Sequence, residues 1–271
     1  MQHKLIAFIG GGNMAQAIIL GLLKQGYPAE QIIVNDPNEK KRAFFANLGV
    51  TTSENNVENV IKAEVVLLAV KPQMMADVCS PLSAVDLSDK LLISIAAGIS
   101  TERLNALIPS VKSIVRVMPN TPALMGEGMA GLFALKNTSE NHRTFAQDLL
   151  GAVGRTVWVD DESQMHAVTA ASGSSPAYFF LMLEAMQKAL IKMNIDEKTA
   201  RELVQQSMLG AAKMVTENPQ IALSTLRENV TSKGGTTAAA LAVFDAQHFN
   251  QTIEQAMQAC LSRSQEMETL F

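Results

Sequence analysis

The sequence predicts an α/β protein in which a doubly wound parallel sheet is followed by an all-helical dimerisation domain. Three observations lead to this fold class. Short apolar runs alternate with helical patterns from residue 4 to about residue 160, three glycines separate the first run from the first helical pattern, and long amphipathic stretches fill the rest of the chain. Strands that alternate with helices are typical of a sheet covered by helices on both faces.

The first half of the chain contains the strand candidates. Two of them, residues 65–70 and 91–97, are apolar at nearly every position, as strands are when helices cover both faces of a parallel sheet. The other expected strands are residues 4–9, 32–35, 113–118 and 156–160, and the expected helices are residues 13–25, 38–48, 73–79 and 101–107.

The second half contains three long amphipathic stretches, at residues 176–193, 196–216 and 248–268. We therefore expect two domains, residues 1–162 and residues 163–271. A helical domain of this size buries little apolar surface by itself, so we expect it to complete its core with a second copy of the chain, as at least a homodimer.

Composition and charge restrict the class of partner. The chain has 271 residues, 48% of them hydrophobic, and a formal net charge of −4 with both signs mixed along its length. This pattern favours a small-molecule partner over nucleic acid or a membrane. The chain shows neither an apolar run of roughly 20 residues nor a secretory pattern, so we expect a cytoplasmic protein. Cys79 and Cys260 have neither disulfide nor metal-site spacing, and we expect reduced thiols and no metal.

The stretch FIGGGNMAQAI, residues 8–18, indicates a dinucleotide-binding turn. Gly10, Gly12 and Ala15 match the G-x-G-x-x-A pattern between a strand and a helix. The first glycine permits a tight turn, the second lets a pyrophosphate approach the backbone, and the small third residue lets helix and strand pack closely. The first domain is therefore expected to be of the Rossmann type.

The second strand ends in Asn35 and Asp36, where a Rossmann-type domain meets the adenosine ribose. An acid at this point accepts hydrogen bonds from a free 2′-hydroxyl and repels a 2′-phosphate, so Asp36 slightly favours NAD. Lys40, Lys41 and Arg42 follow on the next helix and could oppose this preference, but we interpret them as a solvated helix face.

Two further segments, AVKPQ (69–73) and RVMPNTPA (116–123), end predicted strands. The carboxyl edge of an open α/β sheet is where ligands bind, so both segments are expected to face the cofactor. A purely structural interpretation, in which the prolines stop the strands, leaves Lys71 and Asn120 unexplained.

A third segment, TSKGGTTAAAL (231–241), reads as the start of a helix. Backbone N–H groups after Gly234 and Gly235 can hold a carboxylate while a threonine hydroxyl reaches another polar atom of the same ligand. Alternatively, a threonine is the N-cap of an ordinary helix. Spacing alone leaves both interpretations open.

Six segments together resemble those of pyrroline-5-carboxylate reductases in order and spacing: FIGGGNMAQAI, AVKP, SIAAG, RVMPNTPA, SGSSPAY and VTSKGGTTAAAL. The similarity covers essentially the whole chain. It implies reduction of L-1-pyrroline-5-carboxylate to L-proline by hydride transfer from NADPH or NADH, the last step of proline biosynthesis. It also implies homodimers with shared active sites, which in this family can assemble into rings.

The resemblance also implies the site residues. The catalytic residue is Thr237, whose hydroxyl meets the ring nitrogen of the substrate. The residues implied to hold the substrate are Glu162, Ser232, Gly235, Thr236 and Thr237. Those implied to contact the cofactor are Gly10, Gly12, Asn13, Met14, Asn35, Asp36, Asn56, Ala69, Val70, Lys71, Pro72, Ala97 and Asn229. Asp36 departs from the family pattern, because several relatives carry an uncharged or basic residue there, and this puts the usual NADPH preference in doubt.

Other functions were weighed against this one. A β-hydroxyacid dehydrogenase uses a lysine of the interdomain helix, but Lys188 lies deep in the expected helix. A reductase of other cyclic imines and a non-enzymatic dinucleotide sensor are further alternatives, although the TSKGGTT turn disfavours the sensor. His166 is expected to be satisfied by packing or solvent and not to act as a general acid.

Overall fold

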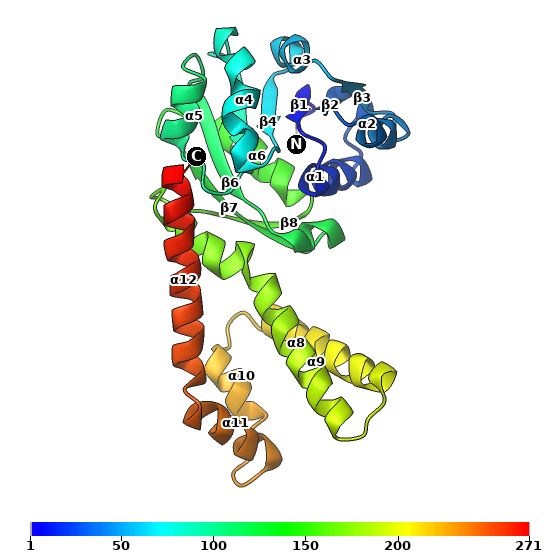
Figure 1. The fold of residues 1–271 in the computed structure, drawn as a ribbon, viewed down its shortest axis with the longest axis vertical. Coiled ribbons are helices and arrows are strands. Elements are labelled where there is room, and N and C mark those ends of the chain that lie inside the picture. The colour runs from blue at the N-terminus through cyan, green and yellow to red at the C-terminus, as the bar shows by residue number, and fades with distance from the viewer. Residues whose placement is uncertain (1, 271) are drawn as a thin grey trace. The chain divides into compact units, whose positions relative to one another are not determined.

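The computed structural model describes residues 2–270, which form two compact units. One unit contains the chain up to Pro176 together with the residues from Ala259 onward, and the other is Ala177–Gln258. The first unit contains the sheet and the second is helical (Figure 1). Each is described here by itself.

The sheet has eight strands in the order β3-β2-β1-β4-β5-β6-β7-β8. All neighbouring strands are parallel except β6 and β7, which are antiparallel. The strands are β1 (Ile6–Ile9), β2 (Ile32–Asn35), β3 (Thr51–Ser53), β4 (Val65–Leu68), β5 (Leu91–Ser94), β6 (Ser113–Met118), β7 (Gly128–Ala134) and β8 (Gly154–Trp158). The predicted strands are confirmed, and β3 and β7 are additions to them.

Helices cover both faces of the sheet, as the fold class predicts (Figure 1). Side chains of α1, α2 and α6 pack on one face with Phe8 and Leu67, and those of α3, α4 and α5 pack on the other with Ile9 and Leu68. Neighbouring strand residues point to opposite faces, which is why strands buried on both faces are apolar at every position. These helices are α1 (Asn13–Lys24), α2 (Glu39–Ala46), α3 (Asn56–Lys62), α4 (Met75–Cys79), α5 (Thr101–Leu107) and α6 (Glu140–Gly151).

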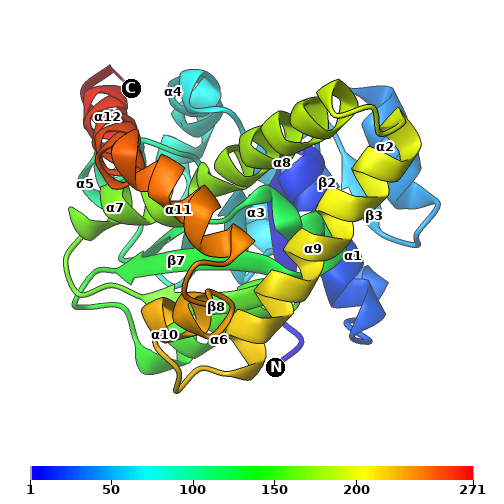
Figure 2. The same ribbon diagram turned by 90° about the horizontal axis from the view of Figure 1, so that it is seen from below.

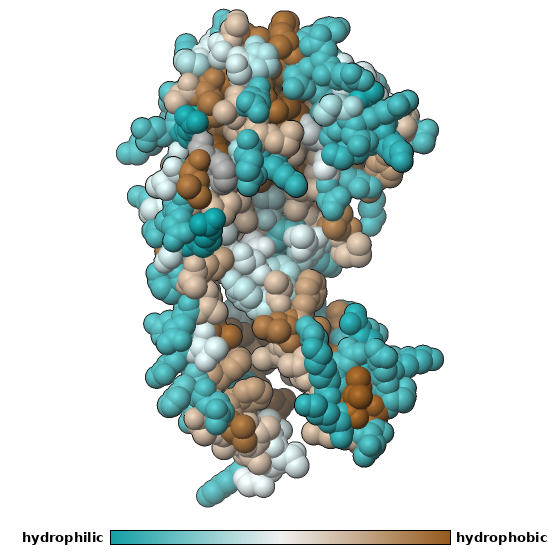
Figure 3. All heavy atoms as spheres, in the orientation of Figure 1, coloured by the Kyte–Doolittle hydropathy of each residue, from teal (hydrophilic) through white to brown (hydrophobic). Residues whose placement is uncertain are grey.

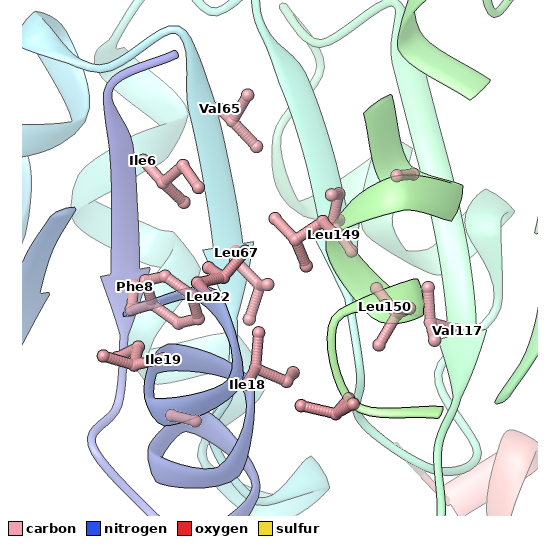
Figure 4. Packing of buried hydrophobic residues seen from close by; sticks show 14 of the residues in the cluster. Ile6, Phe8, Ile18, Ile19, Leu22, Val65, Leu67, Val117, Leu149 and Leu150 are labelled. Atoms are coloured by element: carbon pink, nitrogen blue, oxygen red, sulfur yellow. The ribbon is translucent and has the colours of Figure 1, made fainter. Parts of the chain in front are cut away.

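The larger of the two cores includes residues of β1, β4 and α1, together with Val117 of β6 and Leu149 and Leu150 of α6 (Figure 4). Ile18, Ile19 and Leu22 of α1 point toward Phe8 and Leu67 and are fully buried. This packing fixes the start of α1 directly after β1, so the position of the glycine turn follows from the core.

The helical unit buries much less of its apolar surface. It contains most of α8 (Ser175–Lys192), all of α9 (Glu197–Glu217), α10 (Leu223–Asn229) and α11 (Thr236–Ala246), and the start of α12 (Phe249–Leu270). Helices α8 and α9 form a hairpin that turns at Asn194, whose φ is +66° (Figure 2). Among the described residues of α8, α10 and α11, none is buried. Hydrophobic side chains are exposed on the surface of this unit (Figure 3).

The boundaries of the two compact units differ from the expected domain boundary after residue 162. Helix α7 (Gln164–Val168), the π-helical segment Thr169–Gly173 and the end of α12 all belong to the first unit. The reason is a set of buried polar contacts, described below, that joins α7 and α12 to the sheet. As a division into domains, the boundary at residue 162 stays a prediction.

Candidate active site

The glycine turn after β1 leaves its backbone open to a ligand. Gly10 has a φ of +101°, and a Cβ there would lie 2.7 Å from the carbonyl oxygen of Ala69. By contrast, a Cβ at Gly12 would meet nothing within 4 Å. Gly12 is the N-cap of α1, and no described side chain caps this helix. The orphan N–H groups of its first turn therefore form a cradle that suits a pyrophosphate.

Gly11 explains the third glycine of the run. A Cβ at this position would lie 2.8 Å from Cε2 of Phe45, so any other residue would force the Phe45 ring of α2 to move. The N–H of Gly11 donates to Oδ2 of Asp36 at 2.8 Å. The G-x-G-x-x-A pattern gives no signal for this glycine, because its neighbours come from another strand and helix.

Asp36 is buried, and its carboxylate accepts hydrogen bonds from several donors. Besides Gly11, the N–H of Asn38 donates at 2.9 Å and Nζ of Lys41 at 3.0 Å. Burial acts to raise the pKa of Asp36, but the hydrogen bonds from Gly11, Asn38 and Lys41 outweigh it, and the pKa lies below its ordinary value. Asp36 is therefore an anion at neutral pH that the glycine turn and α2 share.

The interpretation of the basic residues on α2 as a solvated face is wrong for Arg42, whose side chain is 17% exposed, and incomplete for Lys41, which is exposed but paired. Lys41 pairs with Asp36, and Nη1 of Arg42 donates to the carbonyl oxygen of Asp36 at 2.8 Å. Arg42 also pairs with Glu54 at 2.5 Å. Lys40 is exposed, as expected. Two cationic side chains of α2 therefore lie beside the acid at the end of β2.

Asn35 does not present its side chain to a ribose. It is 1% exposed; its Nδ2 donates to the carbonyl oxygen of Phe8, and its Oδ1 accepts from Nδ2 of Asn59 at 2.6 Å. The side chain of Asn35 is thus buried, and its amide is satisfied by one backbone group and one side chain. Asn56, at the start of α3, is partly exposed.

The remaining expected cofactor residues of the first unit gather at one edge of the sheet. Residues 69–72 follow β4, and Ala97 follows β5. The chain order reverses between β1 and β4, and this switch point is where open α/β sheets bind ligands. Lys71 is exposed and Ala97 partly exposed. Asn13 and Met14 open α1 at the same edge.

Asn120 has a structural explanation that the sequence did not reveal. Its Oδ1 accepts from the N–H of Met129 at 2.9 Å, and its Nδ2 donates to the carbonyl oxygen and hydroxyl of Ser172, both at 3.2 Å. It is buried and joins the end of β6 to β7 and to the π-helical segment.

The carboxylate of Glu162 also accepts hydrogen bonds from residues of the first unit. Oε1 accepts from the N–H of Thr101 and from Nη1 of Arg116, both at 2.8 Å, and Oε2 accepts from the hydroxyl of Thr101 at 2.5 Å. In this structure Glu162 is thus a member of a protein network. Its expected place near the substrate stays a prediction.

The turn before α11 has the open form expected of an anion site. Gly235 is the N-cap, with its N–H bonded to the carbonyl oxygen of Ser232 at 3.0 Å, and Gly234 has a φ of +72°. The N-cap alternative is wrong, because Thr236 and Thr237 lie within the first turn and no described side chain caps the helix. Both threonines and Ser232 are exposed.

The expected residues thus form two groups, one in each compact unit. Asn229, the last residue of α10, belongs to the helical unit with the turn before α11. Among the described residues, no group of three or more His, Cys, Asp and Glu side chains is arranged to hold a metal. No helix in residues 2–270 combines the length and apolarity that a membrane span needs.

The doubly wound sheet and its open glycine turn define the class of protein, an NAD(P)-dependent oxidoreductase. A family model described as "NADP oxidoreductase coenzyme F420-dependent" matches residues 5–98, and one described as "Pyrroline-5-carboxylate reductase dimerisation" matches residues 162–267. A pyrroline-5-carboxylate reductase of Haemophilus influenzae is 95% identical over 271 residues, the full length of both chains. This chain belongs to the pyrroline-5-carboxylate reductase family.

More distant relatives agree with this assignment. A pyrroline-5-carboxylate reductase of Pseudomonas aeruginosa is 45% identical over 98% of both chains. The solved structure of a pyrroline-5-carboxylate reductase from Coxiella burnetii matches with a TM-score of 0.92 and 38% identity over 98% of this chain and 99% of that one. A pyrroline carboxylate reductase of Plasmodium falciparum, solved with NADP bound, matches with a TM-score of 0.88 and 29% identity over 99% of both chains.

Proposed function

We propose that this protein reduces L-1-pyrroline-5-carboxylate to L-proline with a hydride from NADPH or NADH, the last step of proline biosynthesis. The full-length similarity to reductases of this name carries the proposal. The two open helix starts, of α1 and α11, support it, because each offers backbone N–H groups to one of the two anionic ligands.

The residues at the sheet edge fit a dinucleotide. A larger side chain at Gly12 would occupy the open space in this turn. The first-turn N–H groups of α1 point into that space. When bound, the nicotinamide supplies the hydride. The residues proposed to hold it are Gly10, Gly12, Asn13, Met14, Asp36, Asn56, Ala69, Val70, Lys71, Pro72, Ala97 and Asn229. The backbone of Asn35 stays in this set, although its side chain is turned away.

The turn before α11 binds the substrate. N–H groups at Thr236 and Thr237 hold the carboxylate, with Ser232 and Gly235 shaping the turn. A cyclic imine accepts hydride at carbon most readily when its nitrogen is protonated, so the site needs a hydrogen-bond partner at nitrogen. The hydroxyl of Thr237 is that partner, since it can accept from the protonated imine and also donate.

Each active site combines the first unit of one protomer with the helical unit of its partner. The support is the open apolar surface of the helical unit: Phe180 and Leu181 of α8 are 64% and 67% exposed. Helices α8, α10 and α11 also leave a hollow of about 690 Å³, lined in part by Met182, Leu241 and Phe244. A second copy that covers these faces forms a homodimer, and dimers can assemble further into rings.

Both dinucleotides are accepted, with a slight preference for NADH. The charge of Asp36 favours a free 2′-hydroxyl, whereas Lys41 and Arg42 at the same strand end offset it for a 2′-phosphate. The cytoplasmic location stays a prediction.

Thr237→Ala tests the proposal most directly. We expect kcat to fall about tenfold to a hundredfold, as the loss of one hydrogen bond to a reacting nitrogen predicts, while the Kd of the dinucleotide stays within about twofold. The measurement is oxidation of NADH and NADPH with pyrroline-5-carboxylate, beside nucleotide titration.

Thr216→Ala is the matched control, since Thr216 is an exposed threonine whose hydroxyl binds only the carbonyl oxygen of Lys213. It should leave both constants unchanged. An equal loss of nucleotide binding in Thr237→Ala would contradict the role of the hydroxyl, and dinucleotide binding without turnover in the wild type would contradict the reaction.

A further inference from the structure

Arg116 is a buried arginine in the middle of the sheet. It lies on β6 in register with Ser94 of β5 and Phe133 of β7, and its side chain is 4% exposed. Its Nη1 donates to Oε1 of Glu162 at 2.8 Å and to Oε1 of Glu268 at 2.7 Å. A guanidinium is retained in such a place only when carboxylates balance its charge.

The first carboxylate holds the start of α5. Glu162 accepts from both the N–H and the hydroxyl of Thr101, the first residue of that helix. The N–H groups of a first helical turn lack partners in the helix and favour a negative charge. Arg116 fixes the carboxylate in this position, and thereby fixes the point where the β5–α5 loop, residues 95–100, enters the helix.

The second carboxylate holds the end of α12 against the same loop. Oε2 of Glu268 lies 2.9 Å from Nε2 of His166, and Nδ1 of His166 lies 2.9 Å from the hydroxyl of Ser264. Next to Glu268, Met267 contacts Gly98: a Cβ on Gly98, whose φ is +70°, would lie 2.9 Å from Cβ of Met267. The loop is therefore clamped between Thr101 and the last turns of α12.

Ala97 lies in the middle of this clamped loop, at the carboxyl edge of the sheet. It is partly exposed and is among the residues proposed to contact the cofactor. Among residues 2–270, the side chain of Arg116 bonds Glu162 and Glu268, and that of Glu268 also lies against His166. The two residues therefore act on the loop through Thr101 and Met267.

We propose that Arg116 and Glu268 are positioning residues, which hold residues 95–100 in the conformation that receives the nicotinamide half of the dinucleotide. This inference rests on the proposed function, because it takes Ala97 as a cofactor contact. It assigns a role to a network that includes neither the glycine turn nor Thr237.

Glu268→Gln is the main test, because it removes one charge and keeps the shape. We expect kcat/KM for the preferred dinucleotide to fall about tenfold, as displacement of a contact surface predicts. The inhibition constant of the fragment that lacks nicotinamide, ADP-ribose or its 2′-phosphate, should stay within about twofold. Amide hydrogen exchange of residues 95–100 should become faster, measured on the protein without ligand.

Glu266→Gln on the same helix is the matched control, since Glu266 forms an exposed pair with Arg263. It should change none of the three quantities. Arg116→Lys, which keeps the charge, should lose less kcat/KM than Arg116→Gln, whereas a role in packing alone predicts equal losses.

Two results would overturn the inference. One is unchanged exchange of residues 95–100 in Glu268→Gln, and the other is a loss of fragment binding as large as the loss for the whole dinucleotide. A wild-type protein that binds no dinucleotide would instead overturn the proposed function. The exchange measurement, which needs no ligand, would then still decide whether the network holds the loop.

Discussion

Asp36 is the residue proposed to influence the choice of dinucleotide. We expect Asp36→Ser to raise the ratio of kcat/KM for NADPH over NADH by about tenfold, because it removes an anion and releases Lys41 toward a 2′-phosphate. The measurement is the pair of specificity constants, compared with Asp89→Ser, in which an 81% exposed carboxylate before β5 is changed. An unchanged ratio would show that Asp36 does not act on the ribose.

Tyr27 gives a prediction for alkaline pH. Its hydroxyl donates to the carbonyl oxygen of Lys4 at 2.5 Å, and burial, with a smaller effect of Glu64, raises its pKa to about 12. Because the folded protein favours the neutral phenol, the stabilisation is complete below pH 10 and is lost as the pH rises through 12. The tyrosinate absorbance that Tyr27→Phe lacks should appear near pH 12 in the folded protein and near pH 10 in urea. A midpoint near pH 10 in the folded protein would contradict the burial argument.

At the scale of the element, helix α1 connects the core with the cofactor site. Its buried side chains, among them Ile18, Ile19 and Leu22, set the position of its first turn (Figure 4). Leu20 of the same helix is 39% exposed. The same helix therefore offers a core position and a surface position side by side.

We expect Ile19→Ala to lower the free energy of unfolding by about 3 kcal/mol, since it leaves a cavity beneath the sheet. Leu20→Ala removes a side chain of similar volume and should cost less than about 1 kcal/mol. Urea unfolding followed by circular dichroism measures both. Equal losses would mean that α1 has a different buried face.

The sequence predicts a helix or strand correctly where a single local pattern is sufficient to specify it. The runs at β1, β4 and β5 are apolar on both faces, so no other arrangement satisfies them. Strand β7 was missed because GMAGLFA contains two glycines and lacks β-branched residues, and Gly131 is required there by its contact with Val168. Strand β3 has only three residues, all polar. Pairing with a neighbour, and not propensity, makes these two segments strands.

At the scale of the whole molecule, the exposed apolar surface of the helical unit requires a partner. We expect the wild type to sediment as a dimer or larger, and Phe180→Glu, which places a charge on a 64% exposed aromatic position of α8, to shift it toward the monomer with loss of activity. Activity should fall with dissociation, because the proposed site combines residues of two protomers.

Ile61→Glu is the control for this prediction, because Ile61 is 56% exposed on α3 of the first unit. It should leave both mass and activity unchanged. A Phe180→Glu protein that stays dimeric and active would place the interface on another surface.

The sequence by itself determined the fold class, the glycine turn and the presence of a helix start after Gly235, whereas the structure decided that Gly235 and not a threonine is the N-cap there. Each depends on neighbours in the chain: a strand, two or three glycines and a helix start within a few residues. Tertiary structure alone decided where Asn35 points, why Gly11 is a glycine and which partners Lys41 and Glu162 have. Arg116 and Glu268 are 152 residues apart, and their contact exists only because the chain returns α12 to the sheet. Contacts between distant segments depend on packing, and no local pattern contains them.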